Sequence, residues 1–359
     1  MRQSCCRIRH LTPRASGCAR RSSAIRSPVN QQRKTVSRPE TPAKPDEEDF
    51  DRLPTKGTRM IKRHLLGTIF ALALTSSAHA GDVKVINEDA WFAEGPIWYQ
   101  GKLFYVEYGR GTVTVWDGKR NEIFWKMDGC GPSAVLPTTT GEFLVTCYDS
   151  NSIGRISADG KTLPAYDKDT DGNPFSGPND LAPDKDGGVY FTGSGKGGPL
   201  IDASAYYIGK DGSVRKVAGD LHNANGLVMS NDGKNLYLGE TEDNRIIEFD
   251  VQPDHSLNNR RVFLRLDDLF PNQPHIWPDG IKMDKAGEMY IGQSPRSLDA
   301  PGKILVVDKD AKLLRTLSVP SPSMPNFAFG PDENVLYVMA LDQIDAAPWH
   351  GKVYEVPNK

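Results

Sequence analysis

Side chains with amide or carboxylate oxygens recur at one position of an internal sequence repeat. Each copy has a short apolar strand, a turn and a second strand rich in β-forming residues, and the clearest copy spans 177–192. Six copies align, and their equivalent position holds Glu94, Ser133, Asn179, Asn225, Asp279 and Asn326. Five of these six side chains offer an oxygen of the kind that Ca²⁺ binds. The repeat therefore indicates a metal site assembled from several copies.

The period of the repeat is typical of a β-propeller. Successive aligned positions are 39, 46, 46, 54 and 47 residues apart, and blades of short strands recur every 40–50 residues or so. No helical periodicity of useful length is present. The sequence therefore predicts an all-β, six-bladed β-propeller. Equivalent positions of its blades converge on a central channel, where we expect the oxygen-bearing side chains to meet.

The last repeat lacks one strand. After 335–339 only 352–356 remains to build it, whereas a blade has four strands. The alternating segment 82–86 precedes the first repeat and can supply the missing one. We expect this N-terminal strand to close the ring, which leaves no open sheet edge.

We predict that four of the aligned residues, Glu94, Asn179, Asn225 and Asp279, bind one divalent cation. Two carboxylates balance the charge of Ca²⁺, and two amides complete the shell without repulsion. Ca²⁺ is the first choice, with Zn²⁺ and Mn²⁺ as alternatives. The competing interpretation is that Asn-Asp and Asp-Gly are turn dipeptides that recur with the repeat. Turn residues should follow strands, however, and these precede apolar ones.

Further side chains are candidates for substrate contacts. Asn326 occupies the aligned position of the last blade, and Ser133 is expected only to line the channel. His275, beside Trp277, and His222 each lie shortly before an aligned residue and could face the substrate, although a surface or structural histidine is the alternative. Tyr148 and Tyr108 follow the second strands of their blades and could line the pocket mouth. The sequence has no nucleophile elbow, H-E-x-x-H, Walker loop or dinucleotide fingerprint.

Four motifs in order resemble those of the SMP-30/gluconolactonase/LRE-like family. They are Glu-Gly-Pro-Ile-Trp at 94–98, Pro-Asn-Asp-Leu at 178–181, Asn-Gly-Leu at 225–227 and Pro-Asp-Gly at 278–280. The resemblance implies a six-bladed propeller in which the matching Glu, two Asn and Asp surround a divalent cation at the pocket floor. It also implies hydrolysis of lactones, or of phosphotriester-type esters as in related propellers. Sugar-lactone relatives can carry an Arg before the Asn-Asp motif. Here Gly177 and Pro178 stand there, which weakens the expectation of an aldonolactone.

The function we expect is that of an exported, metal-dependent lactonase. Ca²⁺ would polarise the lactone carbonyl for attack by water, with Asp279 as ligand and proton acceptor and a rim histidine as the substitute base. One alternative is a non-catalytic periplasmic ligand-binding propeller with a structural Ca²⁺. Another is a phosphotriesterase-like hydrolase that uses the same site.

The chain divides into three parts. Residues 1–59 carry 14 basic and 6 acidic residues, and we interpret them as a disordered extension from a mis-called start, with a real basic arm or transit peptide as the alternative. Residues 60–80 have the basic start, short apolar run and Ala-His-Ala end of a secretory signal peptide. The propeller spans 81–359. We therefore expect a periplasmic or secreted protein.

The balance of charge restricts the partners of the mature part. Residues 81–359 contain 28 basic and 40 acidic residues, so we expect neither nucleic-acid binding nor stable insertion of this part into a membrane. The expected partner is a small molecule, a lactone. Cys130 and Cys147 lie in one repeat and could form a disulfide. Two buried unpaired thiols are the interpretation we favour.

Overall fold

The computed structural model describes residues 83–358, except 199, 295–301 and 345. The predictions for 1–59 and for the signal peptide at 60–80 lie outside the described residues. Within the described part, no helix has the length and apolar character that crossing a membrane requires. The helical elements described there are the short η1 (Tyr108–Arg110) and α1 (Leu266–Leu269).

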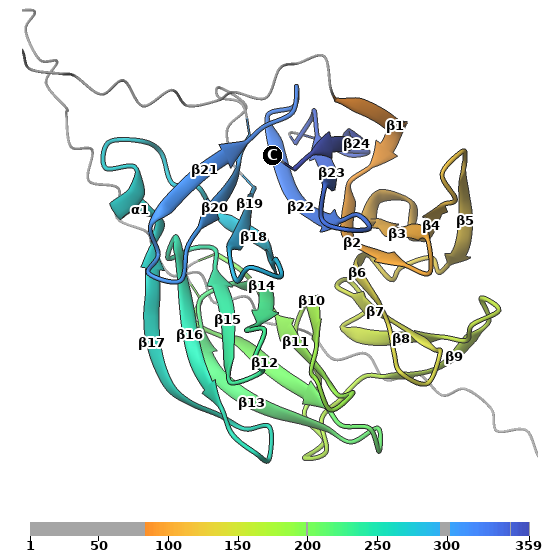
Figure 1. The fold of residues 1–359 in the computed structure, drawn as a ribbon. Helices are drawn as coiled ribbons and strands as arrows, with labels where there is room; N and C mark the ends of the chain where they lie inside the picture. Colours follow the sequence, from red (N-terminus) through yellow and green to blue (C-terminus); the bar gives the residue numbers. More distant parts are fainter. Residues whose placement is uncertain (1–82, 199, 295–301, 345, 359) are drawn as a thin grey trace, which may run out of the picture. The chain divides into compact units, whose positions relative to one another are not determined.

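The repeats fold as antiparallel sheets of four strands (Figure 1). The first sheet contains β2 (Ala93–Tyr99), β3 (Lys102–Glu107), β4 (Thr112–Trp116) and β5 (Asn121–Lys126), and the second contains β6 (Pro132–Pro137), β7 (Phe143–Cys147), β8 (Ser152–Ile156) and β9 (Thr162–Tyr166). The third sheet contains β10 (Pro178–Pro183), β11 (Val189–Gly193), β12 (Ala203–Ile208) and β13 (Val214–Leu221). The fourth sheet contains β14 (Ala224–Met229), β15 (Asn235–Glu240), β16 (Arg245–Val251) and β17 (Leu257–Arg265). Each follows one repeat of the sequence.

The two remaining blades share one larger sheet. Their strands are β18 (Pro278–Met283), β19 (Met289–Gln293), β20 (Ile304–Val307), β21 (Leu313–Leu317), and β22 (Ser323–Phe329), β23 (Val335–Leu341), β24 (His350–Pro357), β1 (Lys84–Trp91). The junction between the two sets is one residue pair, Gln293 with Met324. The strand that completes the last set, β1, comes from the start of the described chain and pairs with β24 from Lys84–Glu355 to Trp91–His350.

The first strands of the blades form a ring. In the order β2, β6, β10, β14, β18, β22, each contacts the next, and β22 contacts β2. This arrangement, with the four-stranded sheets around it, confirms the predicted six-bladed propeller. Apolar side chains of neighbouring sheets pack between the blades, such as Tyr190 of the third blade with Leu227 and Leu238 of the fourth.

The interpretation of Cys130 and Cys147 as unpaired thiols was wrong. They form a disulfide, with Cα atoms 4.5 Å apart. The backbone explains the proximity, because Pro132 pairs with Cys147 at the edge of the β6–β7 ladder and the Asp149 amide donates to the Cys130 carbonyl at 3.0 Å. The loop before β6 therefore folds back onto the end of β7, a close approach that cysteine spacing alone does not reveal.

Candidate functional site

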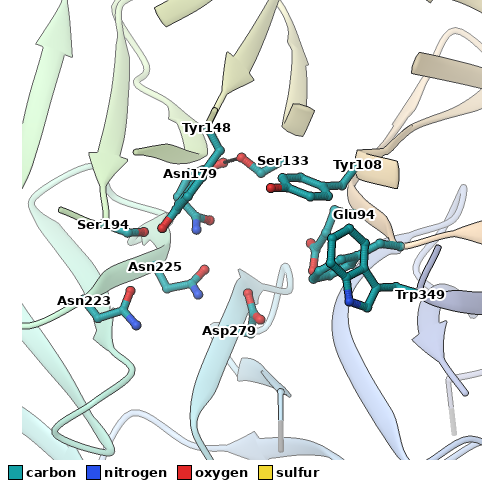
Figure 2. Close-up of a pocket in the computed structure, with 11 residues that line it drawn as sticks. Glu94, Tyr108, Ser133, Tyr148, Asn179, Ser194, Asn223, Asn225, Asp279 and Trp349 are labelled. Carbon is teal, nitrogen blue, oxygen red and sulfur yellow. Dashed lines mark hydrogen bonds between the residues drawn. The ribbon is translucent and has the colours of Figure 1, made fainter. Parts of the chain in front are cut away.

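A cavity of about 350 Å³ lies over the start of the first strands (Figure 2). Four of its lining residues are the predicted ligands Glu94, Asn179, Asn225 and Asp279. The full lining is Phe92, Glu94, Tyr108, Ser133, Tyr148, Asn179, Ser194, Asn223, Asn225, Asp279 and Trp349. All six blades thus contribute residues to one pocket, in which the four predicted ligands lie together. The aligned residue of the last blade, Asn326, is not part of the described lining.

An irregularity in the sheet explains why these side chains face the pocket. In each blade the register between the first and second strands shifts at the aligned position, for example between Pro178 and Leu181 around Asn179. The same shift occurs between Ala224 and Leu227 and between Pro278 and Ile281. A bulge of this kind breaks the ladder locally and re-aims a side chain. Asn179, Asn225 and Asp279 therefore lie outside the ladder and line the pocket instead of continuing the sheet.

Glycines that follow the ligands let the first strands approach closely. A Cβ on Gly226 would lie 2.1 Å from the Asp279 carbonyl oxygen, and one on Gly280 would lie 2.3 Å from the Asn326 side chain. Neither distance leaves room for a methyl group. The glycine in the Asn-Gly and Asp-Gly motifs is thus a packing requirement that brings the ligands of adjacent blades together.

The two carboxylates are buried beside each other. Glu94 is 7% and Asp279 8% exposed. Burial, and then the charge of Asp279, raise the pKa of Glu94 well above its ordinary value. Burial, and then the charge of Asp180, raise the pKa of Asp279 to about 7, against opposing hydrogen bonds from Ser294 and Asn225. A pair of acids in this position is held ionised only if a positive charge joins them.

The donor set fits a divalent cation. The side-chain oxygen of Asn225 is buried and has no hydrogen-bond partner within the described residues, although a buried acceptor without a partner is costly. It lies in the same pocket as the two carboxylates. Carboxylate and amide oxygens without sulfur or imidazole suit Ca²⁺ better than softer metals.

A second group of metal-ligating atoms is a poorer candidate. One ligand atom each of Asp184, Asp186 and His255 lie within 4.8 Å of one another. Protein donors already occupy the Asp184 carboxylate, because it accepts from the amides of Asp186 and Gly188 at 2.8 Å and from the Tyr207 hydroxyl at 2.6 Å. Its second oxygen also lies 3.1 Å from His255 Nδ1.

The predicted substrate contacts divide into those that reach the pocket and those that do not. Tyr148 and Tyr108 line it. Asn326 is 2% exposed and lies behind Gly280, where it accepts from the Phe327 amide at 2.9 Å and hydrogen-bonds to Glu94. It therefore orients the carboxylate of Glu94.

Neither candidate histidine lines this pocket. His275 is half exposed, 3.7 Å from the Asp267 carboxylate, with its ring against Trp277. His222 hydrogen-bonds to Asp243 through Nδ1 at 2.7 Å and to the Gly198 carbonyl through Nε2 at 3.0 Å. The described pocket therefore offers no imidazole as a substitute base.

Four lining residues were not predicted: Phe92, Ser194, Asn223 and Trp349. Phe92 and Asn223 lie two residues before the aligned positions of their blades, so the repeat could have indicated them. Ser194 directly follows β11. Trp349 lies in an irregular segment between β23 and β24 that matches no other repeat, and nothing in the sequence marked it.

Comparison with known proteins agrees with this architecture. The family model for the SMP-30/gluconolactonase/LRE-like region matches residues 92–342. The chain belongs to this family. A gluconolactonase of Zymomonas mobilis is 23% identical over 291 residues, covering 73% of this chain and 80% of that protein. The lactonase drp35 of Staphylococcus saprophyticus is 28% identical over 266 residues, covering 70% and 78%.

Solved structures show the same fold. A gluconolactonase from Xanthomonas campestris superposes with a TM-score of 0.62 at 23% identity, over 81% of this chain and 93% of that one. Regucalcin from Agrobacterium tumefaciens, described as a calcium-binding protein, gives 0.62 at 21% identity, over 76% and 92%. At these identities the likeness establishes the propeller architecture alone.

Proposed function

We propose that this protein is an exported, metal-dependent hydrolase that opens lactones. One observation carries the proposal: two buried carboxylates and the unpartnered oxygen of Asn225 meet in one pocket of about 350 Å³. Relatives of the chain include a gluconolactonase, a lactonase and a pentonolactonase. Their names support a cyclic ester as the substrate.

The four predicted ligands and Asn326 have distinct parts in this reaction. Glu94, Asn179, Asn225 and Asp279 would hold Ca²⁺, with Zn²⁺ or Mn²⁺ as alternatives, which when bound would polarise the carbonyl oxygen of the lactone. Asp279 accepts a proton from the attacking water, whose oxygen bonds to the carbonyl carbon. The ring C–O bond then breaks and the proton passes to the departing alkoxide, giving a hydroxy acid. Asn326 fixes the orientation of Glu94 through its hydrogen bond.

Export to the periplasm or outside the cell is part of the proposal. The apolar segment at 60–80 has the pattern of a signal peptide. The Cys130–Cys147 disulfide supports this location, because such bonds persist in oxidising compartments and are rare in the reducing cytosol.

The deciding experiment measures proton release from a panel of lactones by the purified chain, before and after a chelator and after addition of Ca²⁺, Zn²⁺ or Mn²⁺. We expect metal-dependent turnover that falls at least roughly 100-fold in Asp279→Asn and Asn225→Leu. Asp279→Asn removes the negative charge and the proton acceptor, and Asn225→Leu removes the amide oxygen. Asp310→Asn, in the turn between β20 and β21, is the control for loss of one surface carboxylate.

Other outcomes point to other functions. No turnover of any lactone, with Ca²⁺ still raising the melting temperature of the wild type, would support a binding propeller instead. Turnover of a phosphotriester without turnover of lactones would assign the same site to that class of ester.

A further inference from the structure

Three aromatic rings form one side of the pocket. The ring centroids of Phe92, Tyr108 and Trp349 are 5.5, 5.6 and 6.0 Å apart in their three pairs. Figure 2 shows Tyr108 and Trp349 across the pocket from Asn223 and Asn225. We call these three residues the aromatic wall. All three are partly exposed within the pocket lining.

The aromatic wall is held in place by an unusual backbone. Phe92 and Trp349 have φ values of 50° and 54°, a left-handed conformation that is unfavourable for a bulky residue. The Phe92 amide donates to the Trp349 carbonyl at 2.9 Å, and the Tyr108 amide donates to the Phe92 carbonyl at 3.0 Å. The Tyr108 hydroxyl also donates to Asp149 at 2.8 Å. Strain of this kind persists where surrounding contacts enforce it, and it concentrates at ligand sites.

A fourth ring occupies the place just before the Asn-Asp motif. A Cβ on Gly177 would lie 3.0 Å from the ring of Tyr148, so this ring packs closely against the chain there. Gly177 has a φ of +57°, which also disfavours a side chain. The wall of the pocket beside Asn179 is therefore an aromatic ring.

The protein itself engages the hydroxyl groups of Ser133, Ser194 and Tyr108 in the lining. Ser133 Oγ lies 3.1 and 2.9 Å from the carbonyls of Pro178 and Asn179, and Ser194 Oγ donates to the Ala224 carbonyl at 2.7 Å. None of the described lining residues is basic. A polyhydroxylated ligand needs open donors and acceptors for each hydroxyl, whereas an apolar substituent needs only rings to pack on.

We propose that the pocket selects lactones with an apolar ring substituent, an alkyl or aryl group, over unsubstituted and polyhydroxylated lactones, and that the aromatic wall determines this specificity. The inference rests on the lactonase function proposed above. The substituent packs against Phe92, Tyr108 and Trp349 while the ester group lies over the carboxylates at the floor.

The test compares three five-membered lactones with the full chain in Ca²⁺: γ-nonalactone, which carries a pentyl group, γ-butyrolactone and galactono-1,4-lactone. We expect kcat/KM for γ-nonalactone to exceed both others by roughly 10-fold or more, as expected when several methylenes enter an apolar pocket. Hydrolysis of galactono-1,4-lactone as fast as that of γ-nonalactone would overturn the inference and leave the lactonase function standing.

Variants of the aromatic wall distinguish a loss of substrate specificity from a loss of activity on every substrate. Trp349→Ala should lower kcat/KM for γ-nonalactone roughly 10-fold and change that for γ-butyrolactone less than about 2-fold. Trp349→Phe should restore most of the loss. Trp91→Ala is the matched control, because this partly buried tryptophan packs on His350 outside the pocket lining. Equal losses of kcat/KM for both substrates in a folded Trp349→Ala variant would contradict the proposal. If Trp349→Ala does not fold, Phe92→Leu serves for the same test.

Binding of lactams tests the same preference without turnover. The ring amides 5-pentylpyrrolidin-2-one and pyrrolidin-2-one match two of the lactones in shape, and calorimetry gives their affinities. The pentyl lactam should bind roughly 10-fold tighter to the wild type and lose this advantage in Trp349→Ala. Equal affinities of the wild type for the two lactams would refute the role of the aromatic wall, whether or not any lactone is hydrolysed. A failure to hydrolyse any lactone would instead refute the lactonase proposal.

Discussion

At the scale of single residues, the pocket floor contains buried carboxylates and a buried amide oxygen whose burial is energetically unfavourable. A bound cation would offset the cost of all of them. The charge of Asp279 raises the pKa of Glu94, and that of Asp180 raises the pKa of Asp279. The buried side-chain oxygen of Asn225 has no hydrogen-bond partner among the described residues. Asp180 adds a third buried acid, which Lys282 approaches to 3.6 Å. An arrangement that is unfavourable in the isolated protein becomes favourable when a positive charge is bound.

The cation-free protein should lose stability as the pH rises from about 4 to about 7. In this window folded Asp279, with a pKa of about 7, keeps a proton that the unfolded chain releases near 3.8. The folded state then binds more protons, so the free energy of unfolding falls with rising pH. Melting in a chelator, measured for wild type and Asp279→Asn, isolates this effect from that of Glu94, Asp180 and Lys282. A difference between the two that does not change with pH would contradict it.

The side-chain oxygen of Asn225 should decide metal affinity. Asn225→Leu keeps the approximate volume and removes the oxygen, so we expect Ca²⁺ affinity by calorimetry to fall at least about 10-fold. Asn231→Leu is the control, because this asparagine bonds to the Asp284 carbonyl beyond β14, away from the pocket lining. Unchanged affinity in a folded Asn225→Leu would exclude this residue as a ligand.

At the scale of elements, a bulge and a glycine in the first strand build the site. The bulge turns the ligand inward, and the glycine lets the neighbouring strand pass within contact distance. The bulge recurs in the repeats and the glycine follows Glu94, Asn225 and Asp279, so the aligned positions predicted which four side chains meet in the pocket. Phe92 and Trp349 adopt positive φ outside any ladder, and the Cys130 loop folds back. Such features depend on tertiary contacts, so the sequence did not reveal the wall or the disulfide. His275 shows the opposite error, because proximity in sequence to Asp279 did not bring it into the pocket.

Gly226→Ala should damage both fold and site. The added methyl would lie 2.1 Å from the Asp279 carbonyl, so β14 and β18 must separate, at a cost of roughly 1–3 kcal/mol. Thermal melting should show this loss, and Ca²⁺ affinity should fall with it. Gly154→Ala in β8 is the control, since its nearest contact would be an ordinary 3.4 Å. Equal stability of the two variants would show that the close approach is unnecessary.

At the scale of the whole propeller, the pocket depends on several blades, because each predicted ligand comes from a different sheet. The first-strand ring joins all six blades, and β1, from the start of the described chain, pairs with β24 of the last blade. Pairing of β1 with β24 runs over most of both strands and buries Ala90 completely. Without β1, the β24 edge would present unpaired backbone groups.

Removing β1 should therefore open the ring. We compare chains that begin at residue 81 and at residue 92, and expect the shorter one to melt roughly 10 °C lower, to aggregate more and to lose metal-dependent turnover. A peptide of residues 81–91 added in trans should restore the melting temperature, because it can pair with β24 again. A peptide of the same composition in scrambled order is the control, since it loses the alternation that places one face on the core. If the shorter chain melts at the same temperature as the longer one, β1 does not close the propeller. Rescue by the scrambled peptide would show that the effect lacks register and sequence specificity.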